Sequence, residues 1–230
     1  MYCDHKKPKI IVEIGLNHLG DVKSLYDLFE TVCSSGADAM TIQIREDQFY
    51  KSNPSLFIDY AIVGEFISHA KKTGIEVGLA IGPVESDEVD ALLGRVDFIK
   101  YLSVATRDLD FLMNKMKDYQ MKSYLSVGML KPEEVLRDVI PLLKPDDELI
   151  YTSFTHSAFG QNLGNIGVYQ KYHGLVAYGL HCENKIAAYA AATLGVSSLF
   201  LYVGDKRVVL PDFEHALDIT ELDQYINSIS

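Results

Sequence analysis

The sequence has few cysteines and few basic residues, and each scarcity excludes a class of protein. The three cysteines, Cys3, Cys33 and Cys182, are odd in number and lack the spacing of a metal site, which is typical of free thiols in a reducing compartment. The chain has 21 Lys and Arg against 32 Asp and Glu, a formal charge of -11. We therefore expect no nucleic-acid partner, because binding the phosphate backbone needs clustered cations. A few local cations can still bind a small anion.

Long apolar runs and low-complexity segments are also missing. No run reaches the ~18 apolar residues of a membrane span, and the opening MYCDHKKPK contains no apolar stretch of signal-peptide length. This favours a cytoplasmic protein without a membrane partner. No internal linker is apparent, and 230 residues suit one large α/β domain. We expect a single domain over residues 1–230.

β-rich apolar runs alternate with amphipathic segments along the chain, as in parallel βα units. We predict strands at 9–16, 38–45, 76–83, 98–103, 122–128, 148–154, 175–181 and 198–204. We predict helices at 21–36, 55–73, 85–94, 108–118, 131–142, 160–172, 182–194 and 214–228. Eight of each is the count of a closed (β/α)8 or TIM barrel. An open doubly wound sheet would usually have fewer units and a glycine-rich phosphate loop after its first strand.

Several polar residues stand at the predicted carboxyl ends of strands, where the active sites of TIM barrels lie. Lys100 has apolar neighbours, and because Lys is rarely buried unless paired, a site role is favoured. Thr41, Gln43 and Arg45 alternate on the second strand and therefore share one face. Arg45 can supply a cation to the pocket or form a surface ion pair.

Histidines at or beyond strand ends have two readings each. His181, which opens the polar run that includes Asn184, is either a site residue or a structural histidine with satisfied hydrogen bonds. His18 can cap the following helix or line the pocket. Asp212 and His215 are three apart and would face the same way on a helix, where structural roles are favoured.

Four segments, in order, resemble the barrel domain of the sialic acid synthase family. They are VEIGLNHLGD with GADAMTIQ (12–21, 36–43), FIKYLSVATRDLDFLMNKM with KSYLSVGM (98–116, 122–129), YGLHCENKIAAYAAATLGV (178–196) and PDFEHALDITEL (211–222). The resemblance spans nearly the whole chain in register with the predicted barrel. It implies an enzyme that condenses phosphoenolpyruvate with a sugar aldehyde such as N-acetylmannosamine. It also implies a divalent metal, typically manganese, that is held by two His and orients the aldehyde.

The resemblance assigns roles to individual positions. Those that match family residues are Lys100, Ser103 and Ser126 for phosphoenolpyruvate, His181 for the metal, and Gln43 and Asp212 for the sugar. A Lys at a strand end offers a point charge to a phosphate or carboxylate, and hydroxyls add neutral donors. We take Lys100, His181 and Glu13 as catalytic candidates, and add Arg45 and Asn184 to the substrate-binding candidates.

The sequence departs from the family pattern around the metal and the sugar. Thr41 replaces a Lys, Ala105 an acidic residue, and Gly179 and Leu180 a Ser and an Asp. Tyr202 replaces the second His ligand, and a counterpart of the family's C-terminal antifreeze-like domain is missing. A metal held by His181 alone would bind weakly. We therefore expect a weakened manganese or magnesium site, with Glu13 and His215 as potential substitute ligands.

Three hypotheses follow. The first is a divergent synthase, a transferase that joins phosphoenolpyruvate or a similar three-carbon acid to a sugar aldehyde in surface polysaccharide biosynthesis. The second is another aldolase or lyase on the same barrel, which would require a neutral Lys100 amine to form a Schiff base. The third is a catalytically silent barrel that binds a sugar or a protein. The sequence leaves a homodimer open and does not identify the sugar.

Overall fold

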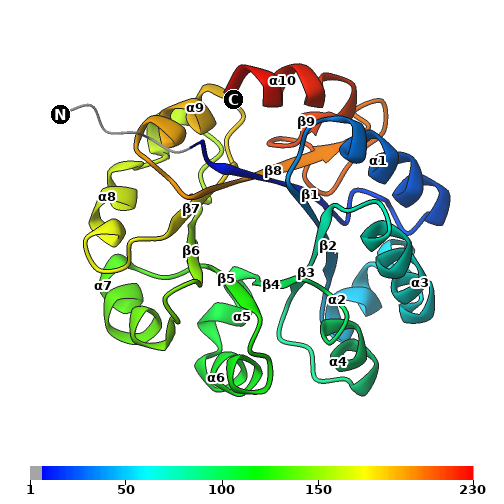
Figure 1. Ribbon diagram of the computed structural model, residues 1–230, viewed down its shortest axis with the longest axis horizontal. Coiled ribbons are helices and arrows are strands. Elements are labelled where there is room, and N and C mark those ends of the chain that lie inside the picture. Colours follow the sequence, from blue (N-terminus) through cyan, green and yellow to red (C-terminus); the bar gives the residue numbers. More distant parts are fainter. Residues whose placement is uncertain (1–6, 230) are drawn as a thin grey trace.

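The computed structural model describes residues 7–229, and these form one closed barrel (Figure 1). Its strands are β1 (Lys9–Gly15), β2 (Ala39–Ile44), β3 (Glu76–Ile81), β4 (Phe98–Tyr101), β5 (Lys122–Ser126), β6 (Glu148–Tyr151), β7 (Val176–Gly179) and β8 (Ser198–Gly204). Each strand pairs in parallel with the next, and β1 pairs with β8 to close the ring. The predicted (β/α)8 barrel is confirmed.

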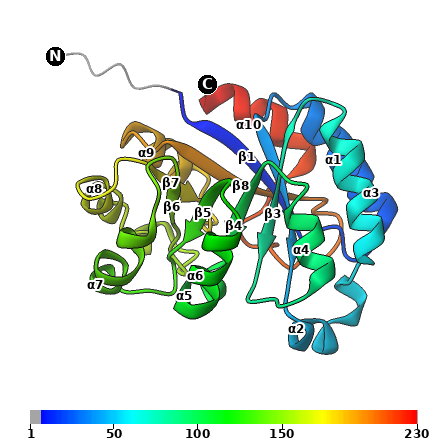
Figure 2. The same ribbon diagram turned by 60° about the horizontal axis from the view of Figure 1, so that its bottom comes forward.

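The helices form an outer ring around the strands (Figures 1 and 2). They are α1 (Val22–Ser34), α2 (Asp47–Ser52), α3 (Tyr60–Lys71), α4 (Asp87–Leu93), α5 (Ser103–Arg107), α6 (Leu109–Asp118), α7 (Pro132–Glu134), α8 (Gly164–Gln170), α9 (Ile186–Thr193) and α10 (Leu222–Ile229). Helix α1 follows its predicted pattern: Asp21 caps it through the Ser24 amide, and Gly36 just beyond it has a φ of 78°. Within residues 7–229, no helix combines the length and apolarity needed to cross a membrane.

Two predicted helices differ from the observed elements. The segment 131–142 is divided into α7, a π-helical turn at Val135–Val139 and a 3-10 turn at Ile140–Leu142. Pro141 lacks the amide proton that a continuous α-helix would use, so the segment cannot remain regular. The predicted helix 214–228 begins only at Leu222, because a short strand β9 (Leu217–Asp218) pairs with β8 first.

Side chains fill the interior of the barrel from the amino-terminal ends of the strands to its middle. A cluster of buried side chains occupies it, namely Ile11, Ala39, Phe98, Tyr124, Ile150, Ala177 and Phe200. The ring of Tyr124 packs edge-to-face against Phe98 at 5.1 Å and against Phe200 at 5.2 Å. Gly78 lacks a side chain where a Cβ would lie 2.1 Å from the Phe98 ring. Open space for a ligand inside the barrel therefore remains only towards the carboxyl ends of the strands.

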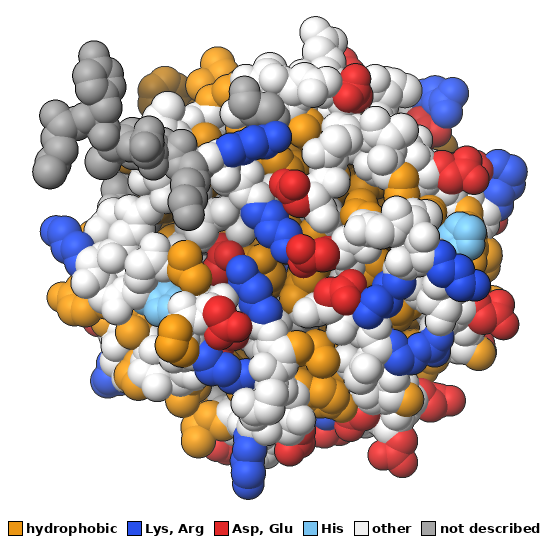
Figure 3. All heavy atoms as spheres, in the orientation of Figure 1, with side chains coloured by type: hydrophobic (Ala, Val, Ile, Leu, Met, Phe, Trp, Pro, Cys, Tyr) orange, Lys and Arg blue, Asp and Glu red, His pale blue; other side chains and the backbone are white. Residues whose placement is uncertain are grey.

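The amino-terminal end of the barrel is closed by a repeated polar contact. An aspartate just before β2, β4 and β6 accepts a hydrogen bond from an amide near the start of the preceding strand. Asp38 accepts from Ile10 at 2.7 Å, and Asp147 accepts from Ser123 at 2.8 Å. The same arrangement joins Asp97 to β3. Basic and acidic side chains lie close together near the centre of the face in Figure 3. These contacts satisfy strand amides that have no ladder partner.

We predict that Asp147→Ala lowers the free energy of unfolding by about 1–3 kcal/mol, the cost of leaving a buried donor unsatisfied. Asp147 is fully buried and accepts from two amides, those of Ser123 and Lys144. Asp146→Ala is the matched control, because Asp146 is exposed, and it should change the value by less than about 0.5 kcal/mol. Urea unfolding measures the stability of the two variants. Equal unfolding midpoints for Asp147→Ala and Asp146→Ala would contradict the structural role of Asp147.

Candidate active site

A cavity of about 200 Å³ lies at the carboxyl ends of the strands. The structure brings six predicted positions together in its lining, namely Gln43, Lys100, Ser103, Ser126, His181 and Asp212. Arg45 lines the same cavity. These residues come from β2, β4, β5, the start of α5, and the loops after β7 and β8. The convergence is a fact of the structure, whereas the chemical roles of the residues remain predictions.

The floor of the cavity is a buried ion pair. Lys100 on β4 donates a hydrogen bond to the carboxylate of Glu13 on β1 and a second, at 3.1 Å, to the hydroxyl of Tyr202 on β8. The side chains of Lys100 and Glu13 are 1% and 0% exposed. Glu13 is absent from the cavity lining and contacts Lys100 from behind it. Its structural position is that of a residue that orients the cation.

Hydroxyl groups form one wall of the cavity. Ser103 begins α5, Ser126 ends β5, and their hydroxyls share a hydrogen bond of 2.9 Å. Arg45 lies at the rim, where its guanidinium pairs with Glu46 at 2.9 Å and covers the ring of Phe49 at 4.3 Å. Both alternatives for Arg45 therefore hold, since it forms an ion pair and also lines the cavity. One hydroxyl donates in this bond and the other accepts, so one serine keeps its proton for a ligand, and both can donate to a ligand only if their mutual bond opens.

Three histidines from separate loops stack beside the cavity. The ring of His215 lies 4.2 Å from that of His181 and 5.3 Å from that of His156, with nearly parallel planes. Burial, followed by the charges of neighbouring groups, lowers the pKa of His181 well below its usual value. Burial likewise lowers the pKa of His215 to about 3. Both imidazoles are therefore neutral at pH 7.

A second cavity of about 620 Å³ adjoins the first. It lies between the loops that follow β6 and β8 and is bordered by Phe154, His156, Phe213 and His215. The two cavities share His181, Asp212 and Phe154 in their linings. Because these side chains border both spaces, they lie where molecules bound in the two cavities would meet.

Asp212 is the acid on this shared border. Burial and then the charge of Glu13 raise the pKa of Asp212 to about 7, against the opposing effects of Lys100 and Asn17. An oxygen of Asp212 lies 3.5 Å from Nε2 of His215. Both residues lie in the turns before β9, so the predicted helix 214–228 does not include His215 in this structure. Asp212 is protonated below about pH 7 and charged above it.

The side chains present do not fit the manganese centre that the resemblance implies. The Tyr202 hydroxyl accepts a hydrogen bond from Lys100, and burial raises the pKa of Tyr202 well above its usual value, so it is no anionic ligand. Glu13 is paired with Lys100, and the rings of His181 and His215 stack face to face, with centroids 4.2 Å apart. Within residues 7–229, no group of three or more His, Cys, Asp or Glu is arranged to hold a metal ion. Neither substitute ligand therefore completes a metal site with His181.

Asn184 and His18 do not join the cavity. The Asn184 side chain is exposed and accepts a hydrogen bond from the Ile186 amide at 3.0 Å, which caps α9. It lines neither cavity at the carboxyl ends, so the structure does not bring it together with the other predicted site residues. His18 is buried and accepts from the Gly20 amide at 2.9 Å, and burial lowers the pKa of His18 to about 4. Both side chains are thus engaged in hydrogen bonds with nearby backbone amides.

The sequence places residues 153–156 at the end of the sixth predicted strand without giving them individual roles. Thr152 and Phe154 line the smaller cavity, and His156 lines the larger one. Their position just beyond a strand end is the signal that could have identified them. The histidine stack has no such signal, because its members are far apart in sequence.

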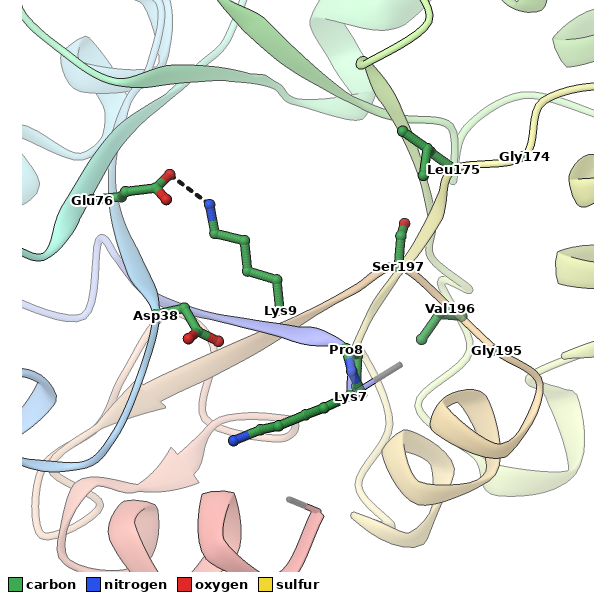
Figure 4. Close-up of a pocket in the computed structure, with 10 residues that line it drawn as sticks. All are labelled: Lys7, Pro8, Lys9, Asp38, Glu76, Gly174, Leu175, Gly195, Val196 and Ser197. Atoms are coloured by element: carbon green, nitrogen blue, oxygen red, sulfur yellow. Dashed lines mark hydrogen bonds and ion pairs between the residues drawn. The ribbon is translucent and has the colours of Figure 1, made fainter. Parts of the chain in front are cut away.

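The largest depression, about 780 Å³, lies at the opposite end of the barrel (Figure 4). Its charged groups contact one another: Lys9 points towards Glu76 at 2.5 Å, and Asp38 is engaged by the Ile10 amide. These contacts are part of the polar closure at the amino-terminal end of the barrel. Size alone therefore does not identify the chemical site, and the smaller cavity has the convergent polar groups.

No protein-family model matches the sequence, and no curated protein is detectably similar to it. Solved structures are similar. An N-acetylneuraminic acid synthetase from Leptospira borgpetersenii, in complex with citrate, superposes with a TM-score of 0.86 at 16% identity over 98% of this chain and 83% of that one. The spore coat polysaccharide biosynthesis protein spsE from Bacillus subtilis gives 0.80 at 17% identity, over 96% and 67%.

A truncated 3-deoxy-D-arabino-heptulosonate 7-phosphate synthase from Thermotoga maritima gives a TM-score of 0.73 at 13% identity, over 96% of this chain and 85% of that one. At such low identities a shared structure establishes the fold and no more. At that level, the resemblance to the sialic acid synthase barrel is confirmed.

We predict that Glu13→Leu and Lys100→Met each destabilise the protein by about 3–5 kcal/mol, because each leaves an uncompensated buried charge. The double variant should recover most of this loss, since two apolar side chains replace a buried ion pair at little net cost. Chemical denaturation gives the free energy of unfolding of the wild type and of the three variants. If the loss in the double variant equalled the sum of the two single losses, the pairing of Glu13 with Lys100 would be contradicted.

Proposed function

We propose that the smaller cavity binds phosphoenolpyruvate or a similar three-carbon acid and that the protein joins it to a sugar aldehyde. The observation that carries this proposal is the convergence of Lys100, Ser103 and Ser126 on a cavity of about 200 Å³. Since liquid water occupies about 30 Å³ per molecule, that space equals roughly six or seven waters, which suits a small acid. The adjoining space of about 620 Å³ is large enough for a sugar.

The cavity offers several donors to an anion. Lys100 provides a fixed ammonium, and the two serine hydroxyls provide neutral donors on its other side. Because Glu13 already neutralises Lys100, the anion would also depend on the hydroxyls and on Arg45 at the rim. Because several donors each contribute part of the binding, a small acid with more than one charged group is favoured over an acid with a single carboxylate.

Similar solved structures support this reaction class. One is a sialic acid synthetase in complex with citrate, a tricarboxylate, and another is a heptulosonate phosphate synthase. Two spore coat polysaccharide biosynthesis proteins share the barrel, which supports a place in surface polysaccharide synthesis. We therefore propose a transferase of the cytoplasm with one domain, whose partners are small molecules. Free Cys33 and Cys182 agree with a reducing compartment.

The ion pair argues against the Schiff-base alternative. Imine formation requires a free amine, whereas the Lys100 nitrogen is engaged in a buried ion pair with Glu13. The proposed role of Lys100 is therefore electrostatic. A catalytically silent barrel would bind a ligand without converting it, so a measurement of turnover distinguishes this alternative from an enzyme.

We predict that phosphoenolpyruvate binds the wild type and that Ser103→Ala/Ser126→Ala weakens binding about tenfold or more. Two lost hydrogen bonds of about 0.5–1.5 kcal/mol each correspond to this change. Ser34→Ala/Ser52→Ala is the control, since both serines are exposed on α1 and α2. Isothermal titration measures the affinities. Equal affinity for both double variants, or no binding to the wild type, would contradict the proposed site.

We further expect no covalent adduct when the protein is treated with pyruvate and borohydride, because the Lys100 nitrogen is engaged by Glu13 and Tyr202. Mass spectrometry of the intact protein and of its peptides provides the measurement. A reduced adduct on Lys100 would instead support an aldolase or lyase that works through a Schiff base.

A further inference from the structure

The proposed reaction places negative charge on the aldehyde oxygen and requires a group that stabilises this charge. The residues present do not fit the divalent metal that the resemblance implies for this task. The polar side chains that line both cavities are His181 and Asp212. They border the space where an acid in the smaller cavity would meet an aldehyde in the larger one.

We propose that His181 and Asp212 together hold the carbonyl oxygen of the acceptor aldehyde, and that Asp212 protonates it, in place of a metal ion. The inference rests on the proposed function and assigns the two residues a catalytic role in it. Asp212 would thus contact the reacting atom and would not serve as a sugar-binding residue alone.

The contacts of the two side chains leave them available to a ligand. His181 packs against the rings of His215, Tyr202 and Phe154, and its imidazole makes no hydrogen bond to any residue within 7–229. The Asp212 side chain is 22% exposed, and its nearest cationic or imidazole neighbour is Nε2 of His215 at 3.5 Å. A neutral imidazole and a carboxylic acid can both donate a hydrogen bond to a carbonyl oxygen.

The surroundings favour the protonation states that this role needs. The groups that face Asp212 are Glu13 from β1, Lys100 from β4, Tyr202 from β8 and His215 from its own loop. Burial and the charge of Glu13 raise the pKa of Asp212 to about 7, while burial keeps His181 neutral. Neutral acids and imidazoles in dry sites stabilise developing oxyanions at other active sites.

The proposed step balances without a metal. C3 of phosphoenolpyruvate attacks the aldehyde carbon, and the carbonyl electron pair moves to the oxygen, which takes the proton of Asp212. Water then adds to C2 and returns one proton to the Asp212 carboxylate. The bond between C2 and the phosphate oxygen breaks, the C2 ketone forms, and the second proton of the water leaves with the phosphate.

The test uses the full chain after chelation with EDTA and desalting. Phosphate release from phosphoenolpyruvate is measured with neutral hexoses, N-acetylated hexoses and phosphorylated tetroses as acceptors. The chelated wild type should retain its rate, and Asp212→Asn should lower kcat by about 10²–10⁴-fold, the usual contribution of a positioned acid. Asp205→Asn changes a half-buried residue of the same loop that lines neither cavity, and it should keep the wild-type rate.

The split between kcat and binding separates catalysis by Asp212 from a structural role. The loss in Asp212→Asn should fall on kcat, and the affinity for phosphoenolpyruvate should change much less, because the proposed proton goes to the other substrate although Asp212 also borders the smaller cavity. A wild-type rate in Asp212→Asn would overturn its role.

Manganese binding gives a readout that does not depend on turnover. Equilibrium dialysis should find no stoichiometric Mn²⁺ on the wild type. Stoichiometric Mn²⁺ that is lost in His181→Asn, or activity that disappears on chelation and returns with Mn²⁺, would overturn this inference and leave the proposed function intact. A wild type that neither binds phosphoenolpyruvate nor releases phosphate would overturn the proposed function and the inference together.

Discussion

The ion pair between Lys100 and Glu13 is the constraint on which the upper half of the barrel depends. It joins β1 to β4 across 87 residues of sequence, and the Tyr202 hydroxyl ties the same ammonium to β8. Below it the barrel is filled by apolar and aromatic side chains, and Lys100 lies 5.0 Å from the Phe200 ring. A charge placed there is costly unless paired, so the pair fixes both the floor of the cavity and the position of its cation.

Neutrality is the common property of the groups around this pair. Lys100 and Glu13 cancel each other, Asp212 is half-protonated near pH 7, and the imidazoles of His181 and His215 are uncharged. Burial is the main cause in each shifted group. A site of this kind can accept an anion and can donate protons, but it lacks the converging ligands that a divalent metal requires.

The sequence predicted the barrel well because hydrophobic periodicity is local, and all eight strands appear within a few residues of their expected bounds. The positions at strand ends could also be predicted, since the fold directs them to one face. The cap made by Asn184, the stack formed by His156 and the distorted segment 131–142 could not. Each depends on packing or backbone geometry that residue spacing does not encode.

A crystal structure of the protein soaked with phosphoenolpyruvate and Mn²⁺ tests the central claim most directly. We expect phosphoenolpyruvate in the smaller cavity, with its anionic groups against Lys100, Ser103 and Ser126, and no anomalous manganese peak at His181. An empty cavity, or a ligand bound only at the opposite end of the barrel, would contradict the anion site. Manganese bound by His181 would contradict the metal-free arrangement of the acceptor site.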